Sequence, residues 1–344
     1  MLEYKHMEKD KQIDILAIGD IATDVFIKIK DAEETCDLQG GHCKLCLKFG
    51  GKIPYESAKE CFAVGNSSNV AICVSRLGLK SALMANIGDD QNGINCLDVL
   101  KKEKVDTNFI KKEFGKPTNY HYVLWYDKEH TILTKHEKYE YEWTKTKELE
   151  EYHSPAWIYL SSLGEDSLSF YNEIIEYLKK HVKVKLAFSP GSFQIKLGTE
   201  ALKDIYKNTE VFICNFKEAQ TILKNENEDM PTLLKEMHDL GPKIVVITDG
   251  RKGAYSYDGK YILFIKAFTE QPAVESTGAG DSFSGAFIGA LFLGKEISDA
   301  LVWGMANSRS VVLYVGPHKG LLTRDQIEEY IKNAPTDYKP IKIN

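Results

Sequence analysis

From residue 155 onward, short apolar segments alternate with amphipathic segments, and this alternation constrains the fold more than any other feature. The apolar segments have the length and composition of strands and cover Trp157–Leu160, Lys185–Phe188, Val211–Cys214 and Lys243–Thr248. Helical patterns lie between and after them, at 168–181, 200–206, 217–224 and 230–240. Alternating strands and helices predict a mostly parallel sheet with helices on both faces, in the α/β class.

The first half of the chain adds similar elements and one region of a different kind. Ile13–Ile18 reads as a strand, and the apolar spacing in 69–77 predicts a helix. Residues 31–62 are polar, cysteine-containing and rich in glycine, which indicates a loop or a small subdomain. Residues 119–136 alternate apolar and polar side chains across a polar turn, which is typical of a β-hairpin.

These patterns predict one large α/β domain that carries a small β element, which we call the lid. The domain covers residues 13–330, and the lid is built from the segments near 20–62 and 119–136. We expect residues 331–344 to form a C-terminal tail.

Charge and hydropathy argue against several functional classes. The 344 residues carry a net charge of −6, whereas a nucleic-acid binder needs a basic surface. The sequence contains no apolar run of the length that crosses a membrane, and its charged N-terminus does not resemble a signal peptide. We therefore expect a cytoplasmic protein with no nucleic-acid or membrane partner.

The cysteines gather in the first half of the chain. We expect no disulfide framework in a chain of this size without a secretory signal. His42 and four cysteines, at positions 36, 43, 46 and 61, suggest a metal cluster in the lid. A single C-x-x-C pair is a weak zinc pattern, so reduced thiols in a loop are the other interpretation.

The segment Glu275–Leu291 (ESTGAGDSFSGAFIGAL) carries the clearest chemical signal. Its glycines let the backbone approach a ligand closely, and the helix that follows directs unpaired N–H groups at anionic oxygens. Asp281 lies at this helix start, where a carboxylate can take a proton from an attacking hydroxyl. The alternative is a capping aspartate followed by small residues that serve helix packing.

Two common phosphate-binding motifs do not account for this segment. The sequence contains no G-x-x-x-x-G-K-[ST], which excludes a P-loop. Phe283 occupies the place of the third glycine of a G-x-G-x-x-G motif, which disfavours a dinucleotide-binding fold.

Five motifs together resemble the ribokinase-like (PfkB) carbohydrate kinase family. Residues 277–281 (TGAGD) match its C-terminal signature, and residues 64–78 with the later Gly88-Asp89-Asp90 match its N-terminal signature. Gly19 to Asp24 match its first strand and substrate aspartate. Asn215 to Glu218 and Thr248 to Gly253 match its N-x-x-E and T-x-G-x-x-G motifs. The match covers roughly residues 13 to 330 and implies a three-layer fold with a β-sheet lid.

The resemblance implies an ATP-dependent kinase that acts on an alcohol. Asp281 would be the base, and the backbone N–H groups of Gly278, Ala279 and Gly280 would form the anion hole. Asn215 and Glu218 would organise Mg²⁺ and its waters. The implied nucleotide contacts are Thr248, Gly250, Gly253 and, near the adenine, Asn307.

The resemblance also implies the acceptor site. Asp24, Gly65, Asn66 and Asn69 would hold substrate hydroxyls, since a carboxylate and an amide suit vicinal OH groups. Val64 departs from the family pattern, which has a glycine there, and this puts the pocket shape in question. Glu275 and Thr277 fall where some relatives hold a monovalent cation such as K⁺.

Several polar residues near the lid have two interpretations. His121, His130 and His136 are expected at solvated strand positions, with contact to substrate as the alternative. Basic residues of this region and of the nucleotide loop would bind a phosphate if the acceptor is already phosphorylated, and otherwise form a solvated face: Lys135, His136, Lys138 and Arg251.

Three functions remain open at this point. The first is a sugar kinase or, on the same fold, a nucleoside kinase. The second is a non-catalytic ligand-binding protein on a kinase scaffold, and the third is a metal-dependent lid module. The resemblance further implies a homodimer formed through the lid.

Overall fold

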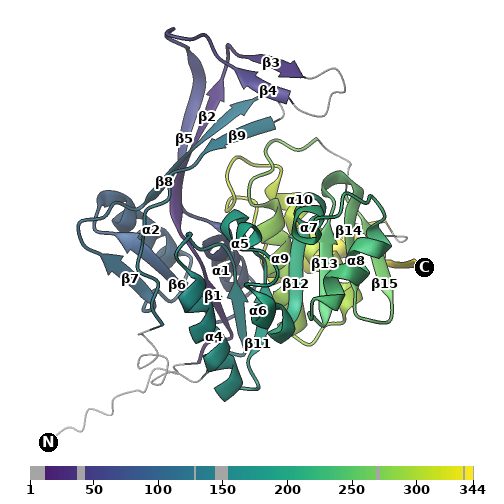
Figure 1. Cartoon of the computed structure of the whole chain (residues 1–344). Coiled ribbons are helices and arrows are strands. Elements are labelled where there is room, and N and C mark those ends of the chain that lie inside the picture. The colour runs from purple at the N-terminus through teal and green to yellow at the C-terminus, as the bar shows by residue number, and fades with distance from the viewer. Residues whose placement is uncertain are drawn as a thin grey trace, which may run out of the picture.

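The structure is a computed structural model that describes residues 12–36, 43–127, 129–143, 154–268, 272–335 and 338–343. Within these ranges the strands form a ten-stranded sheet, a four-stranded sheet and a two-stranded hairpin. The large sheet is the centre of the body, and the smaller sheets project from it (Figure 1).

The large sheet is parallel over most of its width. Six neighbouring pairs, from β7 to β13, are parallel, and the last three pairs are antiparallel. In spatial order its strands are β16 (Ile341–Ile343), β15 (Ile262–Lys266), β14 (Gly253–Tyr257), β13 (Ile244–Thr248), β12 (Thr209–Asn215), β11 (Lys185–Phe188), β10 (Trp157–Leu160), β1 (Ile15–Ile18), β6 (Ser81–Gly88) and β7 (Ile110–Glu113).

Helices cover both faces of this sheet, which confirms the predicted α/β class. One buried apolar cluster joins the sheet to α1, α2, α9, α10 and α11, and a second joins it to α4, α6, α7 and α8. The helices are α1 (Asn66–Arg76), α2 (Gln91–Lys102), α4 (Leu168–Lys180), α5 (Ser192–Leu197), α6 (Lys203–Asn208), α7 (Phe216–Leu223), α8 (Met230–Asp239), α9 (Ala279–Phe292), α10 (Ile297–Val311) and α11 (Arg324–Asn333). The continuous apolar runs of β1 and β10 follow from this burial on both faces.

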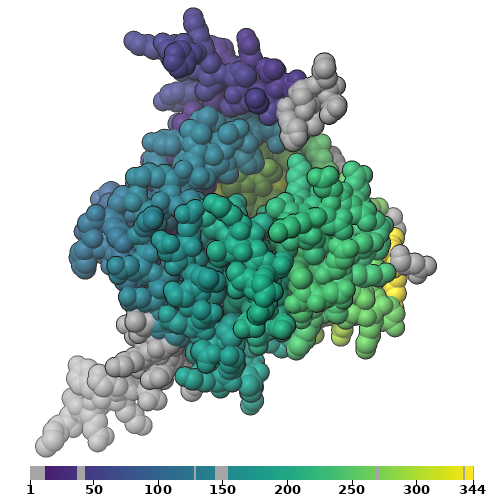
Figure 2. Space-filling model, viewed as in Figure 1, coloured from purple at the N-terminus to yellow at the C-terminus, as the bar shows by residue number. Residues whose placement is uncertain are grey.

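The four-stranded sheet is made of the two segments assigned to the lid. Its order is β5 (Tyr55–Val64), β2 (Ala22–Ile29), β8 (Asn119–Tyr126) and β9 (Glu129–Leu133). β2 pairs antiparallel with β5 and parallel with β8. Figure 2 shows this sheet, in purple to blue, above the green body with a recess between them.

The region 31–62 is richer in strands than its composition indicated. It contains all of β3 (Glu33–Cys36) and β4 (Cys43–Cys46) and most of the ten-residue β5. The first six side chains of β5 are exposed, so no buried face imposes the apolar alternation that marks a strand.

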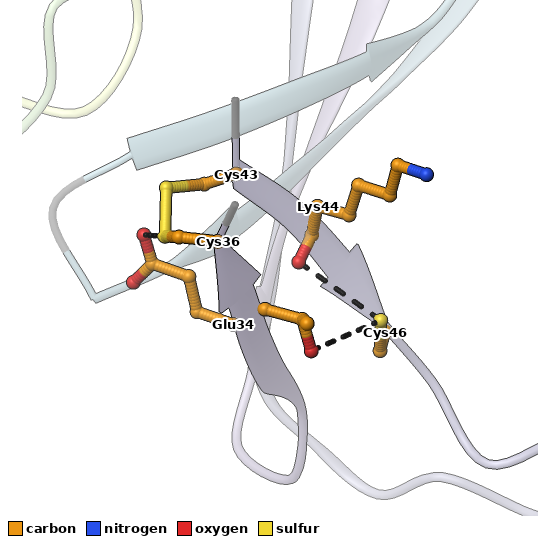
Figure 3. Close-up of a disulfide and its surroundings, with 6 residues drawn as sticks. Glu34, Cys36, Cys43, Lys44 and Cys46 are labelled. Atoms are coloured by element: carbon orange, nitrogen blue, oxygen red, sulfur yellow. Dashed lines mark hydrogen bonds between the residues drawn. A yellow bond between two sulfur atoms is a disulfide. The ribbon is translucent and has the colours of Figure 1, made fainter. Parts of the chain in front are cut away.

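A disulfide joins Cys36 to Cys43, contrary to the expectation of reduced thiols (Figure 3). β3 and β4 pair antiparallel with these two residues opposite each other, and their Cα atoms lie 4.0 Å apart. Cys46 lies near the Thr35 hydroxyl instead, and Cys61 is on β5 beside Gly316. His42 lies outside the described residues. The four cysteines therefore do not converge on one metal position.

The expected boundary at residue 330 is wrong. α11 continues to Asn333, and β16 pairs antiparallel with β15 at the edge of the large sheet. Tyr338 is buried against Phe268, and its ring stacks at 3.7 Å. These contacts make the described part of the last fourteen residues an element of the body rather than a separate tail.

A search of the described residues for a helix long and apolar enough to cross a membrane finds none.

Gly253 tests the packing of the antiparallel edge. Its φ is +128°, and a Cβ would lie within contact distance of the Ile265 carbonyl oxygen on β15. We expect Gly253→Ala to lower the free energy of unfolding by about 3 kcal/mol. The added Cβ would overlap with the Ile265 carbonyl oxygen, and alanine would also be strained at this positive φ.

Gly250→Ala is the matched control, since Gly250 has φ +49° but open space around its missing Cβ. It should cost only about 1 kcal/mol of backbone strain. Chemical denaturation measures both variants, and equal losses would contradict the packing argument.

Candidate active site

The candidate site lies at the carboxyl ends of the parallel strands, where α9 begins. Asn215 ends β12 and Thr248 ends β13, and the two residues pair in register. They line a cavity of about 190 Å³ together with Gly278, Gly280 and Asp281. Ligands of open α/β sheets bind at this edge, because loops and helix N-termini gather there.

Asp281 is the central charged group of this cavity. Its two carboxylate oxygens accept from the side-chain amides of α1: Asn66 donates to Oδ1 at 2.8 Å, and Asn69 donates to Oδ2 at 2.7 Å. Burial raises the pKa of Asp281, the two amides lower it, and the charge of Asp24 raises it. Asn66 and Asn69, which were expected to bind substrate, thus hold the carboxylate in this structure.

A second layer of residues fixes the amide of Asn69. His318 Nε2 lies 2.9 Å from Asn69 Oδ1 and donates to it, because the Asn69 amide nitrogen already donates to Asp281. Burial and the nearby Arg76 charge lower the pKa of His318 to about 4, so its ring is neutral at pH 7. Arg76 donates to the His318 carbonyl and forms a bidentate pair with Glu103. Sequence reasoning missed this layer.

The glycines before α9 form the floor of the cavity. Gly278 has φ +79°, and a Cβ there would overlap with Pro317 Cβ. A Cβ on Gly280 would meet nothing within 4 Å, so this glycine keeps space open for a ligand. The first-turn N–H groups of a helix have no partner within the helix. Of the three predicted anion-hole residues, Ala279 donates its N–H to the Ser276 carbonyl at 3.2 Å.

Asn215 and Glu218 face the cavity from the start of α7. Each side chain caps the other's backbone N–H, at 2.9 Å in both directions. Burial raises the pKa of Glu218, and the charge of Asp281 adds to this effect. The capping box explains why the N-x-x-E spacing places both residues at one helix end.

Two of the predicted nucleotide contacts have structural roles. Asn307 is fully buried in α10, where its amide donates to the Ser282 carbonyl and its oxygen accepts from the Leu322 N–H. The polar atoms of Asn307 therefore hold α9 and the segment before α11, and its proximity to the adenine stays a prediction. Gly253 is buried against β15, whereas Gly250 lies in the open turn after β13.

Asp24 and Gly65, two of the predicted substrate contacts, lie on the lid strand β2 and directly before α1. Asp24 is 4% exposed and lies 3.2 Å from His121 Nδ1. Gly65 has φ +133°, and a Cβ there would lie 2.5 Å from the Asp20 carbonyl oxygen. Val64, which replaces the usual glycine, is extended and pairs with Ala22, so the strand accommodates it.

The three lid histidines are not at solvated strand positions. All three are half-buried. The rings of His121 and His136 lie 5.0 Å apart, and His130 Nδ1 lies 3.7 Å from the buried carboxylate of Glu275. They point inward because the lid sheet covers the edge of the body from which α1 and α9 begin.

Asp20 is a buried carboxylate that sequence reasoning did not single out. Tyr141 donates to its Oδ1 at 2.7 Å and accepts from the Gly164 N–H. Burial raises the pKa of Asp20 to about 7, against the lowering effects of Tyr141 and His121. Tyr141 lies in a segment without regular secondary structure. No periodic pattern in the sequence could therefore have revealed its contact with Asp20.

Comparison with known proteins identifies the family. Residues 42–324 match the profile described as pfkB family carbohydrate kinase. The chain belongs to this family. The ribokinase of Haemophilus influenzae is 28% identical over 276 residues, which are 78% of this chain and 87% of the relative. This pfkB-family kinase is also 23% identical to the ATP-dependent 6-phosphofructokinase of Thermoanaerobacterium thermosaccharolyticum, over 89% of the chain and 90% of the relative.

A solved structure has the same fold. The ribokinase of Arabidopsis thaliana, complexed with ribose and ATP, superimposes with a TM-score of 0.76 at 18% identity, over 94% of this chain and all of that one. The agreement confirms the predicted ribokinase-like architecture of the pfkB-family body and lid.

Asp20 gives the pfkB-family kinase a pH-dependent stability. The folded state keeps the Asp20 proton up to about pH 7, whereas the unfolded chain loses it near 3.8. The unfolded state therefore binds fewer protons between these values, so ionisation of the unfolded chain lowers stability as pH rises. Above about pH 7 Asp20 is ionised in both states, so its contribution to stability no longer changes with pH.

We expect Asp20→Asn to gain stability relative to the wild type as pH rises from 4 to 7, by at most about 4 kcal/mol. Urea unfolding at a series of pH values measures this difference. A difference that does not change with pH would contradict the raised pKa.

Proposed function

We propose that this protein transfers the γ-phosphoryl group of ATP to a hydroxyl of a sugar or sugar-like molecule. The observation that carries the proposal is Asp281. Its carboxylate accepts hydrogen bonds from two side-chain amides and lies in the first turn of α9, which follows a glycine-rich segment. It also lines the cavity at the carboxyl ends of the parallel strands. This is the arrangement that a base and an anion hole require.

The cavity fits the phosphates of a nucleotide. Gly280 leaves open the volume that a Cβ would fill, and the N-terminus of α9 favours anionic oxygens. Thr248 adds a hydroxyl to the wall, and Gly250 follows it in the adjoining turn. ATP is bound in the related Arabidopsis ribokinase, which supports the assignment of this cavity to the nucleotide.

Mg²⁺ fits beside these residues. Glu218 and Asn215 present oxygens on the same cavity wall, and a hard cation that keeps most of its waters needs few direct ligands. The ion would neutralise charge on the phosphates.

Glu275 offers a candidate ligand for K⁺. Its Oε1 accepts from the Thr277 N–H and hydroxyl, while its Oε2 is buried without a hydrogen-bond partner among the described residues.

In the proposed reaction the chain's own groups position and deprotonate the acceptor. Asp281 takes the proton of the acceptor hydroxyl as that oxygen attacks the γ-phosphorus. The N–H groups at the start of α9 stabilise the charge on the phosphoryl oxygens. Asn66 and Asn69 keep the carboxylate aimed at the acceptor, and the lid excludes water that would otherwise accept the phosphoryl group.

Two further expectations belong to this proposal. The exposed apolar side chains of the lid sheet, including Tyr55, Tyr122 and Leu133, are available for a homodimer through the lid. A cytoplasmic location is the other expectation, from the sequence alone.

ADP release tests the function directly. With a panel of sugars and nucleosides, we expect turnover with at least one sugar. A nucleoside as the best acceptor would move the assignment to a nucleoside kinase. Binding of ATP without any turnover would favour a non-catalytic role.

Asp281→Asn tests the base. We expect kcat with the best acceptor to fall by about 10²- to 10⁴-fold, because the variant cannot take the proton. Asp98→Asn, an exposed aspartate of α2, is the matched control and should leave kcat unchanged. Near-full turnover of Asp281→Asn would remove Asp281 from the role of base.

A further inference from the structure

The lid places two histidines beside the acceptor aspartate. The parallel register of β2 and β8 sets Asp24 opposite His121, with 3.2 Å between Oδ1 and Nδ1. His136 lies beyond His121, and the edge of Phe193 packs against its ring at a centroid distance of 5.2 Å. Phe193 belongs to α5 of the body. The lid and the body therefore meet at this group of rings.

This group contains buried polar atoms that lack hydrogen-bond partners among the described residues. They are Asp20 Oδ2, His121 Nε2 and His136 Nδ1, whereas Asp24 Oδ1 has only the contact with His121 Nδ1. Asp24 and Asp20 are only 4% and 9% exposed. Folded proteins pair nearly all such groups, so a cluster of three indicates that a polar ligand supplies the missing partners.

Hydroxyl groups suit the atoms of this cluster. A carboxylate oxygen accepts, a protonated carboxyl such as Asp20 below about pH 7 also donates, and a neutral imidazole has one donor and one acceptor nitrogen. A hydroxyl both donates and accepts, so a compound with several neighbouring hydroxyls can satisfy acceptors and donors at once. Burial lowers the pKa of His136, and the proximity of His121 adds to this effect, which keeps the His136 ring neutral.

The charges around the cluster are mainly negative. The charge of Asp24 raises the pKa of Asp281 after the larger effect of burial. Burial raises the pKa of the Cys61 thiol to about 11, and Asp24 and Glu275 raise it further against the lowering effect of Lys59. The Lys59 ammonium donates to the Val315 carbonyl at 2.6 Å. A phosphate on the acceptor would have to approach several carboxylates.

Of the basic residues that the sequence offered for an acceptor phosphate, His136 belongs to this cluster, and the other three do not gather there. The side chain of Lys135 is 72% exposed and pairs with Glu137. The side chain of Lys138 is 86% exposed and lies 3.8 Å from Asp166. Arg251 belongs to the turn after β13, on the nucleotide side.

We propose that His121 and His136 complete, with Asp20 and Asp24, a binding site for an uncharged polyhydroxy acceptor, and that this site selects against an acceptor that already carries a phosphate. His121 and His136 are then specificity-determining residues that contact the acceptor. The inference rests on the proposed kinase function, and it decides between the ribokinase-like and the 6-phosphofructokinase-like choice of acceptor.

Paired acceptors test the selection. Initial rates are measured with D-ribose and D-fructose and with D-ribose 5-phosphate and D-fructose 6-phosphate. We expect kcat/KM to be at least tenfold higher for the best neutral sugar than for its phosphorylated counterpart. A higher kcat/KM for the phosphorylated sugar would overturn the inference while the kinase function stands.

Variants test the two histidines. His121→Ala and His136→Ala should each raise KM for the best neutral sugar by about 10-fold or more, with KM for ATP changed by less than twofold. His238→Ala is the matched control, because its ring packs on Tyr257 at the far side of the sheet. An unchanged sugar KM in folded variants would overturn the role of the histidines.

Two further measurements remove the ambiguous outcomes. If an alanine variant does not fold, His136→Arg replaces it: the added charge should raise the ratio of phosphorylated to neutral kcat/KM, and an unchanged ratio counts against the site. If ADP is released with none of the acceptors, the proposed kinase function is wrong. Calorimetric titration of the same four sugars then tests whether the site prefers neutral sugars. Tighter binding of the neutral sugars supports the inference, and tighter binding of the phosphates overturns it.

Discussion

The clamp on Asp281 is the interaction on which the arrangement of the site depends. A buried carboxylate without partners would be neutralised, and Asn66 and Asn69 oppose this by donating to both of its oxygens. The clamp joins the first turns of α1 and α9, so the two helices must begin side by side. His318 and Arg76 extend the same network to the segment before α11. Holding the carboxylate and packing the two helices therefore both require α1 and α9 to begin side by side.

The small residues of α9 allow this close approach. A Cβ on Gly285 would lie 2.7 Å from Cys73 Sγ on α1, and a Cβ on Gly289 would lie 2.6 Å from Leu77. Gly304 of α10 accepts the ring of Phe283 in the same way. The glycines that the sequence offered as packing residues thus bring the two helix N-termini together. The capping-aspartate interpretation is wrong, because the N-cap residue of α9 is Gly278, without a side-chain cap, and the Asp281 carboxylate faces α1. The small residues serve helix packing, as that interpretation expected.

The parts of the molecule that the sequence predicted well are those with local signals. Trp157–Leu160 and Lys185–Phe188 are strands with the predicted bounds, because their buried positions are all apolar. Sequence reasoning could not find contacts between distant segments. Tyr141 on Asp20 and His318 on Asn69 span 121 and 249 residues, and the pairing of Cys36 with Cys43 depends on the register of two exposed strands. The resemblance implied a nucleotide contact for Asn307, and only the packing of α10 reveals that its amide is buried.

We infer that Asp281 takes the proton of the acceptor hydroxyl while the two amides lower the pKa of its carboxyl group. The most direct test is the pH dependence of kcat/KM for the best sugar in the wild type and in Asn69→Ala. Loss of a donor to the carboxylate should raise the pKa of Asp281, so the acidic limb of the profile should move to higher pH. A folded Asn69→Ala enzyme whose acidic limb stays in place would contradict the claim.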